Sequence, residues 1–282
     1  MNRFQAISYV ALCAVLAVAP GAALAQQNYL QQLSTHNSAM TAVQPAFATP
    51  VVEPDPRLVQ YVRVAVSNEY TAARTETVCY GNGKGAGVIA ANRFEFDFMP
   101  PAYIQHNAAT AADGLGDTTA SMKVRLASGN AQHGNYIVSA MLGHTFATGT
   151  YKNGALTDSF GPTLAGAIGV GKRVALESSL GGTMPTGKIA TQGRSIAWNA
   201  LTQVHITPHS IFELENNATF YFAGSHDGKV QNFVTPALFY IERRKEWKPT
   251  HPFWVFDAGM QIATSGFHTY NHNLISEVRL IF

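Results

Sequence analysis

Charged residues are scarce in this sequence, and it has no long apolar run after its first 25 residues. Asp, Glu, Lys and Arg make up 13% of the chain, against roughly 25% in a typical soluble domain. Hydrophobic residues still reach 46%, yet they are not gathered into the blocks that membrane-spanning helices need. This excludes a helical membrane protein and favours apolar residues spread by alternation, as in β-strands.

Cysteine is nearly absent, because only Cys13 and Cys79 occur in the 282 residues. Cys13 falls in a predicted signal peptide, so Cys79 has no partner for an internal disulfide, and a small disulfide-stapled scaffold is excluded. We interpret Cys79 as a lone buried or loop thiol. The formal net charge of +2 gives no electrostatic case for nucleic-acid binding.

The first 25 residues have the parts of a secretory signal peptide. Arg3 supplies a positive charge, residues 7–19 are apolar, and Ala23 and Ala25 frame a small-residue cleavage site. The apolar stretch is shorter than the roughly 20 residues of a membrane-spanning helix. We therefore expect residues 1–25 to be removed. Residues 26–57 contain four of the prolines and are predicted to be a flexible periplasmic lead-in.

From residue 58 onward the hydrophobic pattern has a period of two, which indicates β-strands. Phe94, Phe96 and Phe98 alternate with Glu95 and Asp97, and the last ten residues alternate in the same way. Short turns alternate with longer loops, which is typical of outer-membrane barrels. We predict twelve strands, near 58–68, 84–91, 93–101, 117–127, 135–147, 161–171, 173–183, 195–207, 211–223, 231–242, 252–264 and 273–282.

The predicted fold class is all-β, an antiparallel transmembrane β-barrel over residues 58–282. A closed sheet pairs every backbone N–H and C=O within hydrocarbon, whereas an open edge would leave some unpaired. An even strand number places both ends of the barrel on the periplasmic side. The alternative is a soluble β-sandwich, in which the same rings would fill a core. In a barrel we expect aromatic side chains near the strand ends to face the membrane interface, namely Trp198, Phe212, Phe220, Phe222, Phe233, Phe239, Trp254, Phe256 and Phe282.

The charged faces of the strands are predicted to line the lumen. The candidate lumen residues are Arg63, Glu95, Asp97, Lys123, Arg125, Glu177, Glu213, Glu215, Asp257, Glu277 and Arg279. Buried charges need partners or water. If neighbouring strands are level at their periplasmic ends, the pattern predicts four pairs: Glu95 with Arg125, Asp97 with Lys123, Asp257 with Arg279, and Arg63 with Glu277. Such a network either only rigidifies the lumen or selects solutes.

Several short motifs resemble those of a known family. Asp113-Gly114-Leu115-Gly116-Asp117, followed by Lys123-Val124-Arg125-Leu126, resembles the signature of outer-membrane barrels labelled "MetA-pathway of phenol degradation". The stretches 100–103 and 184–187 and the final Phe282 are also similar. The resemblance covers roughly residues 58–282 and implies a transmembrane barrel that takes up small organic or aromatic compounds. Val278, Leu280 and Phe282 also resemble the signal read by the outer-membrane assembly machinery.

No catalytic, cofactor-binding or metal-binding site is predicted. Ser178 and Ser179 lack the Gly-x-Ser-x-Gly context of a nucleophile. The pairs His205/His209 and His268/His272 are four residues apart, but no cysteine or carboxylate cluster joins them in sequence. We therefore expect an outer-membrane channel or transporter for small solutes, with no cofactor and with membrane lipids, the assembly machinery and the solute as partners. A structural or surface-adhesion barrel and a lipid-modifying barrel enzyme are the alternatives.

Overall fold

The computed structural model describes residues 35–81, 84–242 and 252–282. The predicted signal peptide lies outside these residues. In the described part, the strands are β1 (Tyr61–Tyr70), β2 (Glu76–Tyr80), β3 (Ala86–Ala91), β4 (Phe94–Met99), β5 (Tyr103–His106), β6 (Gly114–Leu115), β7 (Thr118–Gly129), β8 (Tyr136–Phe146), β9 (Ser159–Val170), β10 (Val174–Pro185), β11 (Arg194–His205), β12 (Ser210–Phe222), β13 (Val230–Glu242), β14 (Phe253–Ala263) and β15 (His272–Ile281). Helical turns are short: residues 35–41, α2 (Ile189–Gln192) and η1 (Gly224–His226). No helix among the described residues is long and apolar enough to cross a membrane.

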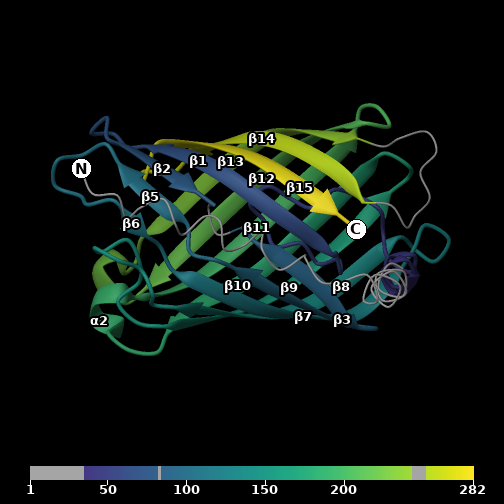
Figure 1. Cartoon of the computed structure of the whole chain (residues 1–282), viewed down its shortest axis with the longest axis horizontal. Helices are drawn as coiled ribbons and strands as arrows, with labels where there is room; N and C mark the ends of the chain where they lie inside the picture. Colours follow the sequence, from purple (N-terminus) through teal and green to yellow (C-terminus); the bar gives the residue numbers. More distant parts are fainter. Residues whose placement is uncertain (1–34, 82–83, 243–251) are drawn as a thin grey trace, which may run out of the picture.

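All the strands belong to one antiparallel sheet, which closes because β15 pairs with β1 along its length (Figure 1). From β7 to β15 each strand pairs with the next strand in the chain. Three wall positions are split between two strands: β2 with β3, β4 with β5, and β6 with β7. Counted by position, the barrel has the twelve strands that the sequence predicts. Pairing of β15 with β1 closes the wall, so the first and last strands leave no open edge there.

The splits fall where the sequence interrupts the hydrogen-bond ladder. Pro100 and Pro101 separate β4 from β5, and a proline has no N–H to donate. Gly85 lies so close to β4 that a Cβ there would be 2.0 Å from the carbonyl oxygen of Phe98. Only glycine allows this approach. The predicted strands 84–91 and 93–101 are therefore each only part of a wall position, and β2, β5 and β6 were not predicted.

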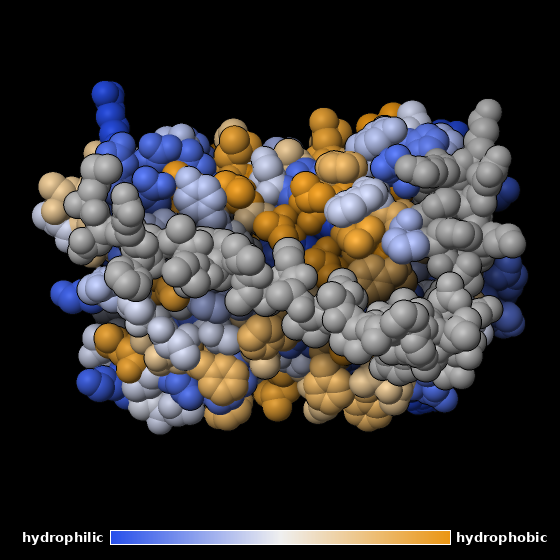
Figure 2. All heavy atoms as spheres, viewed as in Figure 1, coloured by the Kyte–Doolittle hydropathy of each residue, from blue (hydrophilic) through white to orange (hydrophobic). Residues whose placement is uncertain are grey.

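Along most of each strand, side chains alternate between the outside and the inside of the barrel. Phe94, Phe96 and Phe98 point outward with 39%, 48% and 55% of their surface exposed, whereas Glu95 and Asp97 between them are buried. Figure 2 shows hydrophobic side chains over the middle of the outer surface and hydrophilic ones toward the two ends. This is the inverse of a water-soluble sandwich, in which apolar residues fill the core. The barrel prediction is confirmed, and the sandwich alternative is wrong.

The two ends of the barrel differ in the length of their connections. At one end, called here the terminal end, β1 begins, β15 ends and short turns such as 92–93 and 171–173 connect the strands. At the other, the loop end, most connections are longer, for example 147–158 and 264–271, although the terminal end also has the ten-residue connection 243–252. The helix at 35–41 and the C-terminus both lie at the terminal end, and α2 lies at the loop end (Figure 1).

Two of the aromatic residues predicted to face outward do not. Phe233 and Phe239 are each only 3% exposed and point into the barrel. Phe233 stacks on Tyr270 at 4.5 Å between ring centroids, and Phe239 lies 5.3 Å below the guanidinium of Arg279. Alternate residues of a strand face opposite sides, and Phe233 and Phe239 fall on the inward side of β13. Neighbouring Leu238 and Tyr240 take the outward positions, with more than half of their surfaces exposed.

Candidate functional site

The candidate site is the interior of the barrel. All eleven residues predicted to line the lumen are buried there, with between 0% and 8% of their surface exposed. Alternation along each strand puts them inside, because their sequence neighbours point outward. The structure therefore brings together a large set of charged side chains within one enclosed space, where each must be paired or solvated.

The chain before β1 fills this interior. We call residues 35–60 the plug. Ala48 and Val51 pack into a cluster of inward-facing residues with Ile211, Phe239 and other apolar side chains, and Phe47 joins a second cluster with Ile137, Ala167 and Ala175. The expectation of a flexible lead-in therefore does not hold for residues 35–57. The polar, proline-rich composition of this segment suggested flexibility. A segment that packs inside a barrel needs no hydrophobic period of its own, so the sequence pattern gave no sign of this packing.

One side of the lumen holds the carbonyl groups of the plug. Arg63 donates to the carbonyls of Pro50 and Val51 at 2.8 Å each. Lys84 donates to Val51 at 3.0 Å, and Arg279 donates to Pro50 at 3.2 Å and also to Thr49. We call Arg63, Lys84 and Arg279 the basic wall. Hydrogen bonds from charged donors to carbonyl oxygens are among the stronger ones in proteins.

The basic wall carries its own counter-charges. Arg63 pairs with Glu277 at 2.5 Å, and Arg279 pairs with Asp257 at 3.0 Å and with Glu277 at 2.9 Å. Lys84 lies 3.5 Å from the second oxygen of Glu277. The two pairs predicted for these strands are confirmed, although Asp257 lies directly opposite Glu277 in the register and Arg279 reaches it diagonally.

The opposite side of the lumen holds the N–H groups of the plug. Gln203 exchanges two hydrogen bonds with the backbone of Ala48, at 3.0 and 2.8 Å. Glu213 accepts from the N–H of Val51 at 3.1 Å. Glu215 accepts from the N–H groups of Val52 and Glu53 at 2.9 and 3.0 Å. We call Glu177, Glu213 and Glu215 the acidic wall, and the backbone of the plug thus runs between two walls of opposite charge.

Glu177 is the exception within the acidic wall. Its side chain is buried, and among the described residues neither of its oxygens has a hydrogen-bond partner. Glu53 from the plug lies in the same region. Burial, together with the negative charge of Glu215, raises the pKa of Glu53 to about 8. This side of the lumen therefore gathers carboxylates, and among the described residues Glu53, Glu177, Glu213 and Glu215 form no ion pair.

A third side of the lumen is formed by β4 and β7. Two of the predicted ion pairs are not found there. Glu95 faces Lys123, not Arg125, and the two side chains form an ion pair at 2.7 Å. Asp97 faces Ser121, not Lys123, and accepts its hydroxyl at 2.8 Å. The predictions of Glu95 with Arg125 and Asp97 with Lys123 are wrong because the strands are offset by two residues from level ends.

Arg125 is buried on the inside of the adjacent strand, but it binds backbone at the terminal end. It donates to the carbonyl of Met40 at 2.6 Å and to that of Asn92 at 2.8 Å. Lys123 reaches the plug as well, because it donates to the carbonyl of Arg57 at 2.8 Å. Arg125 and Lys123 therefore bind the plug near the terminal end as well as neighbouring groups of the barrel wall.

Within the plug, Arg57 and Asp55 form an ion pair at 2.6 Å. Burial alone would raise the pKa of Asp55, but the positive charges of Arg57 and Lys123 outweigh it and hold the pKa below its usual value. Arg57 also donates to the carbonyl of Phe47 and lies 4.5 Å above its ring. Arg57 therefore links the middle third of the plug to its last third.

The sequence pattern missed several residues of this arrangement. Gln44, Arg57, Lys84 and Gln203 all hold the plug, but none was predicted. Gln203 shares the polar face of β11, so alternation could have found it. The plug residues and Lys84 lie outside regular strands, where no periodicity marks them.

The quoted motif around Asp113 has a supporting role at the loop end. Asp113 accepts the N–H of His106 at 2.8 Å. Asp117 accepts the N–H groups of Gly149 and Ala155 at 2.9 and 2.7 Å. The motif therefore ties the loop 147–158 to the split strands.

The histidines and the serine considered in the sequence contact neighbouring backbone or side chains. His209 contacts the carbonyl of Ile241 at 2.9 Å, and His268 contacts Asn271 at 2.9 Å. Within the described ranges, no group of three or more His, Cys, Asp or Glu residues could hold a metal ion. Ser178 donates to the carbonyl of Asn199 at 2.8 Å, and Cys79 is a free, half-buried thiol.

Comparisons with known proteins point to the fold alone. No family model and no curated protein matches the chain. Among solved structures, it is similar to the outer-membrane channel COG4313 from Pseudomonas putida F1, with a TM-score of 0.51 and 10% identity over 84% of this chain and 100% of that one. It is also similar to the NanC porin, with a TM-score of 0.50 and 8% identity over 78% of this chain and 98% of that one. The chain therefore has the fold of outer-membrane barrels.

Proposed function

We propose that this protein is an outer-membrane channel that its own N-terminal segment holds closed. The observation that carries the proposal is the way in which the plug is held. Its backbone is bound by side chains of the lumen through polar contacts from Thr49 to Glu53. Water can replace such contacts, so the segment can leave the barrel once the apolar contacts of Phe47, Ala48 and Val51 are also given up.

The proposed location is the outer membrane, with the terminal end in the periplasm. The outward-facing apolar side chains would be unfavourable in water and are satisfied by lipid tails. A signal peptide over residues 1–25, the similarity in fold to outer-membrane channels and a terminal assembly signal at Val278, Leu280 and Phe282 support the same location. Membrane lipids and the assembly machinery would then be the first partners.

The proposed solutes are small organic or aromatic compounds that diffuse passively. The resemblance of the 113–117 and 123–126 motifs to the phenol-pathway family supports this class. The lumen itself is lined by charged and polar side chains along both walls. A solute would therefore need a polar group that binds these side chains, or it would have to pass while they stay bound to one another.

A reversible crosslink between plug and wall tests the channel. Ala48 and Gln203 are in contact, so A48C/Q203C would be made in a C79S background that removes the native thiol. We expect the current through planar bilayers to be lower when the crosslink is oxidised than after reduction, when the plug can again leave the barrel as often as it does in the C79S control. C79S alone is the matched control.

The alternatives give different results. A structural or adhesion barrel would carry no current and no liposome flux of small phenols in either redox state. A lipid-modifying enzyme would change the lipid profile of the membrane, and alanine replacement of the buried and loop histidines would abolish that change. Either result would overturn the channel proposal.

A further inference from the structure

A cavity lies at the terminal end, beside the point where the plug crosses the rim of the barrel. Arg93, in the turn between β3 and β4, forms one side, and residues 125–128 of β7 form another. Val43 of the plug forms a third side, and its carbonyl accepts the hydroxyl of Ser128 at 2.8 Å. The cavity holds about 210 Å³, which is room for roughly seven water molecules at about 30 Å³ each. A polar group much larger than water can therefore enter it.

The two charged side chains around this cavity have the same sign. Arg93 and Arg125 are neighbours on adjacent strands, because the N–H of Arg125 donates to the carbonyl of Arg93 at 2.9 Å. Within the described ranges neither side chain forms an ion pair, and no Asp or Glu lines the cavity. Like charges side by side in a sheet repel each other. An anion between the two guanidinium groups would be bound by both.

The rest of the lining joins the cavity to the lipid-facing surface. The ladder between β7 and β8 is irregular between Arg125 and Ala127, and Leu126 points outward there with 50% of its surface exposed. Phe94, which follows Arg93, also points outward. The two cations therefore lie where the rim meets the apolar outer band. A ligand that matches this border has an anionic head and an apolar tail.

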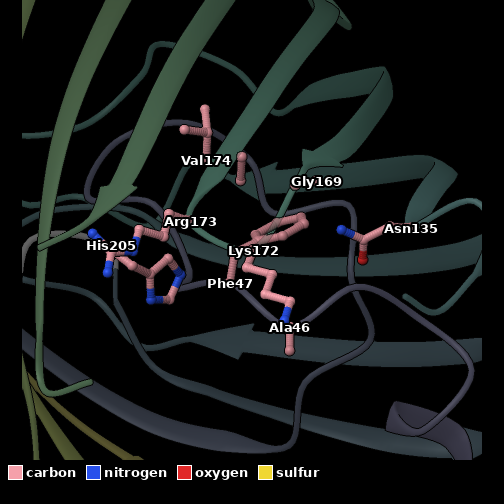
Figure 3. A pocket seen from close by; sticks show the side chains of 10 residues that line it. Ala46, Phe47, Asn135, Gly169, Lys172, Arg173, Val174 and His205 are labelled. Carbon is pink, nitrogen blue, oxygen red and sulfur yellow. The ribbon is translucent and has the colours of Figure 1, made fainter. Parts of the chain in front are cut away.

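The turn between β9 and β10 also carries two cations at the terminal end, but it lacks a comparable space. Lys172 and Arg173 point apart there (Figure 3). The hollow beside them holds about 40 Å³, which is enough for roughly one or two water molecules. Positive charge at this end of the barrel is therefore not sufficient for a site, and Arg173 offers a matched control for Arg93.

We infer that the cavity beside Arg93 binds the phosphate of a membrane phospholipid, with the acyl chains along Leu126 and Phe94. Arginine binds phosphate well because its planar group can donate to two oxygens at once. A lipid fits better than a soluble phosphate, which would leave the outward apolar side chains without contact. The inference rests on the proposed membrane location but requires no flux through the barrel. It places this part of the rim at the headgroups of the periplasmic leaflet.

The test is native mass spectrometry of the purified full-length protein in detergent micelles with added dioleoyl-phosphatidylglycerol. We expect the wild type to retain this lipid saturably, and not to retain dioleoylglycerol, which has the same chains but no phosphate. In R93Q the dissociation constant should rise about tenfold, because one charge-assisted contact is lost. The matched control R173Q removes another exposed arginine at the same end and should bind the lipid as the wild type does.

Three outcomes would overturn the inference: no phospholipid retained by the wild type, equal weakening in R93Q and R173Q, or displacement of the lipid by inorganic phosphate at equal concentration. The last would assign the cavity to a soluble anion. A gel comparison of boiled and unboiled samples checks that each variant is folded. The redox-dependent current of A48C/Q203C tests the channel separately, and failure of the membrane location would show as protein that does not insert into liposomes.

Discussion

The basic and acidic walls of the lumen solve the problem of buried charge in different ways. On the basic wall, Arg63 and Arg279 are paired with Glu277 and Asp257 of the neighbouring strands. On the acidic wall, Glu213 and Glu215 meet the backbone N–H groups of the plug, and Glu177 meets no hydrogen-bond partner among the described residues. The cations of the basic wall have counter-charges on neighbouring strands in addition to the carbonyls of the plug, whereas Glu213 and Glu215 of the acidic wall bind N–H groups of the plug and form no ion pair among the described residues.

This difference suggests which wall stabilises the barrel and which one controls the plug. Removal of one partner from a buried ion pair leaves an uncompensated charge, at a cost of roughly 3–5 kcal/mol. Removal of a hydrogen bond between plug and carboxylate costs less and can be met by water that enters the lumen. We therefore expect changes in the basic wall to affect unfolding, and changes in the acidic wall to affect opening.

The largest effect is expected for R279M. Arg279 is 1% exposed and pairs with Asp257 and Glu277, so both carboxylates would lose a cation. The free energy of unfolding should fall by roughly 3–5 kcal/mol, measured by denaturant titration in detergent. The control R194M changes an exposed arginine at the loop end and should cost less than about 1 kcal/mol. Equal losses of unfolding free energy in R279M and R194M would contradict the stabilising role of the ion pairs in the basic wall.

The next effect concerns the plug itself. E215A leaves the N–H groups of Val52 and Glu53 without their acceptor, which costs about 1–3 kcal/mol for a buried donor. We expect a current in planar bilayers that is at least severalfold larger than that of the wild type, with a smaller change in unfolding than R279M gives. E215Q keeps an acceptor oxygen and should restore most of the closed state. A closed E215A channel would show that apolar packing of Ala48 and Val51 holds the plug.

Much of the barrel could be predicted from the sequence, because alternation specifies which face of a strand is buried. The twelve wall positions and the inward direction of residues such as Glu213 and Arg279 follow from it. The register between neighbouring strands does not follow from alternation, because it depends on the length and conformation of the connection between them. Between β4 and β7 the chain forms β5 and β6, and Glu95 therefore meets Lys123 two residues from the predicted partner.

The plug could not be predicted by the same reasoning. Its side chains have no period, and many of its contacts with the walls are made through backbone groups, which every residue carries. Arg57 and Asp55 pair within the segment, two residues apart, which also looks ordinary in a flexible region. The four prolines that suggested flexibility remove N–H donors, so fewer backbone groups of the plug need partners inside the barrel.

A smaller effect is expected for pH, through Glu53. Its pKa is raised to about 8 by burial and by Glu215, so the closed state binds a proton that the released plug gives up above its ordinary pKa of about 4.5. Closure is then favoured fully at low pH and weakens as the pH rises from about 5 to 8. Current should increase a few-fold over that range in the wild type. E53Q should flatten the profile, and a slope that survives in E53Q would assign the titration to another group.

The smallest effect is expected for E177Q, and its comparison with E277Q separates the two walls most directly. Both glutamates are buried, at 4% and 3% exposure, but Glu277 faces Arg63, Lys84 and Arg279. The free energy of unfolding of E277Q should fall by more than about 2 kcal/mol, whereas that of E177Q should stay within about 1 kcal/mol, because the side chain that is replaced makes no ion pair or hydrogen bond among the described residues. A large loss in E177Q would mean that its carboxylate binds a cation or another partner inside the barrel.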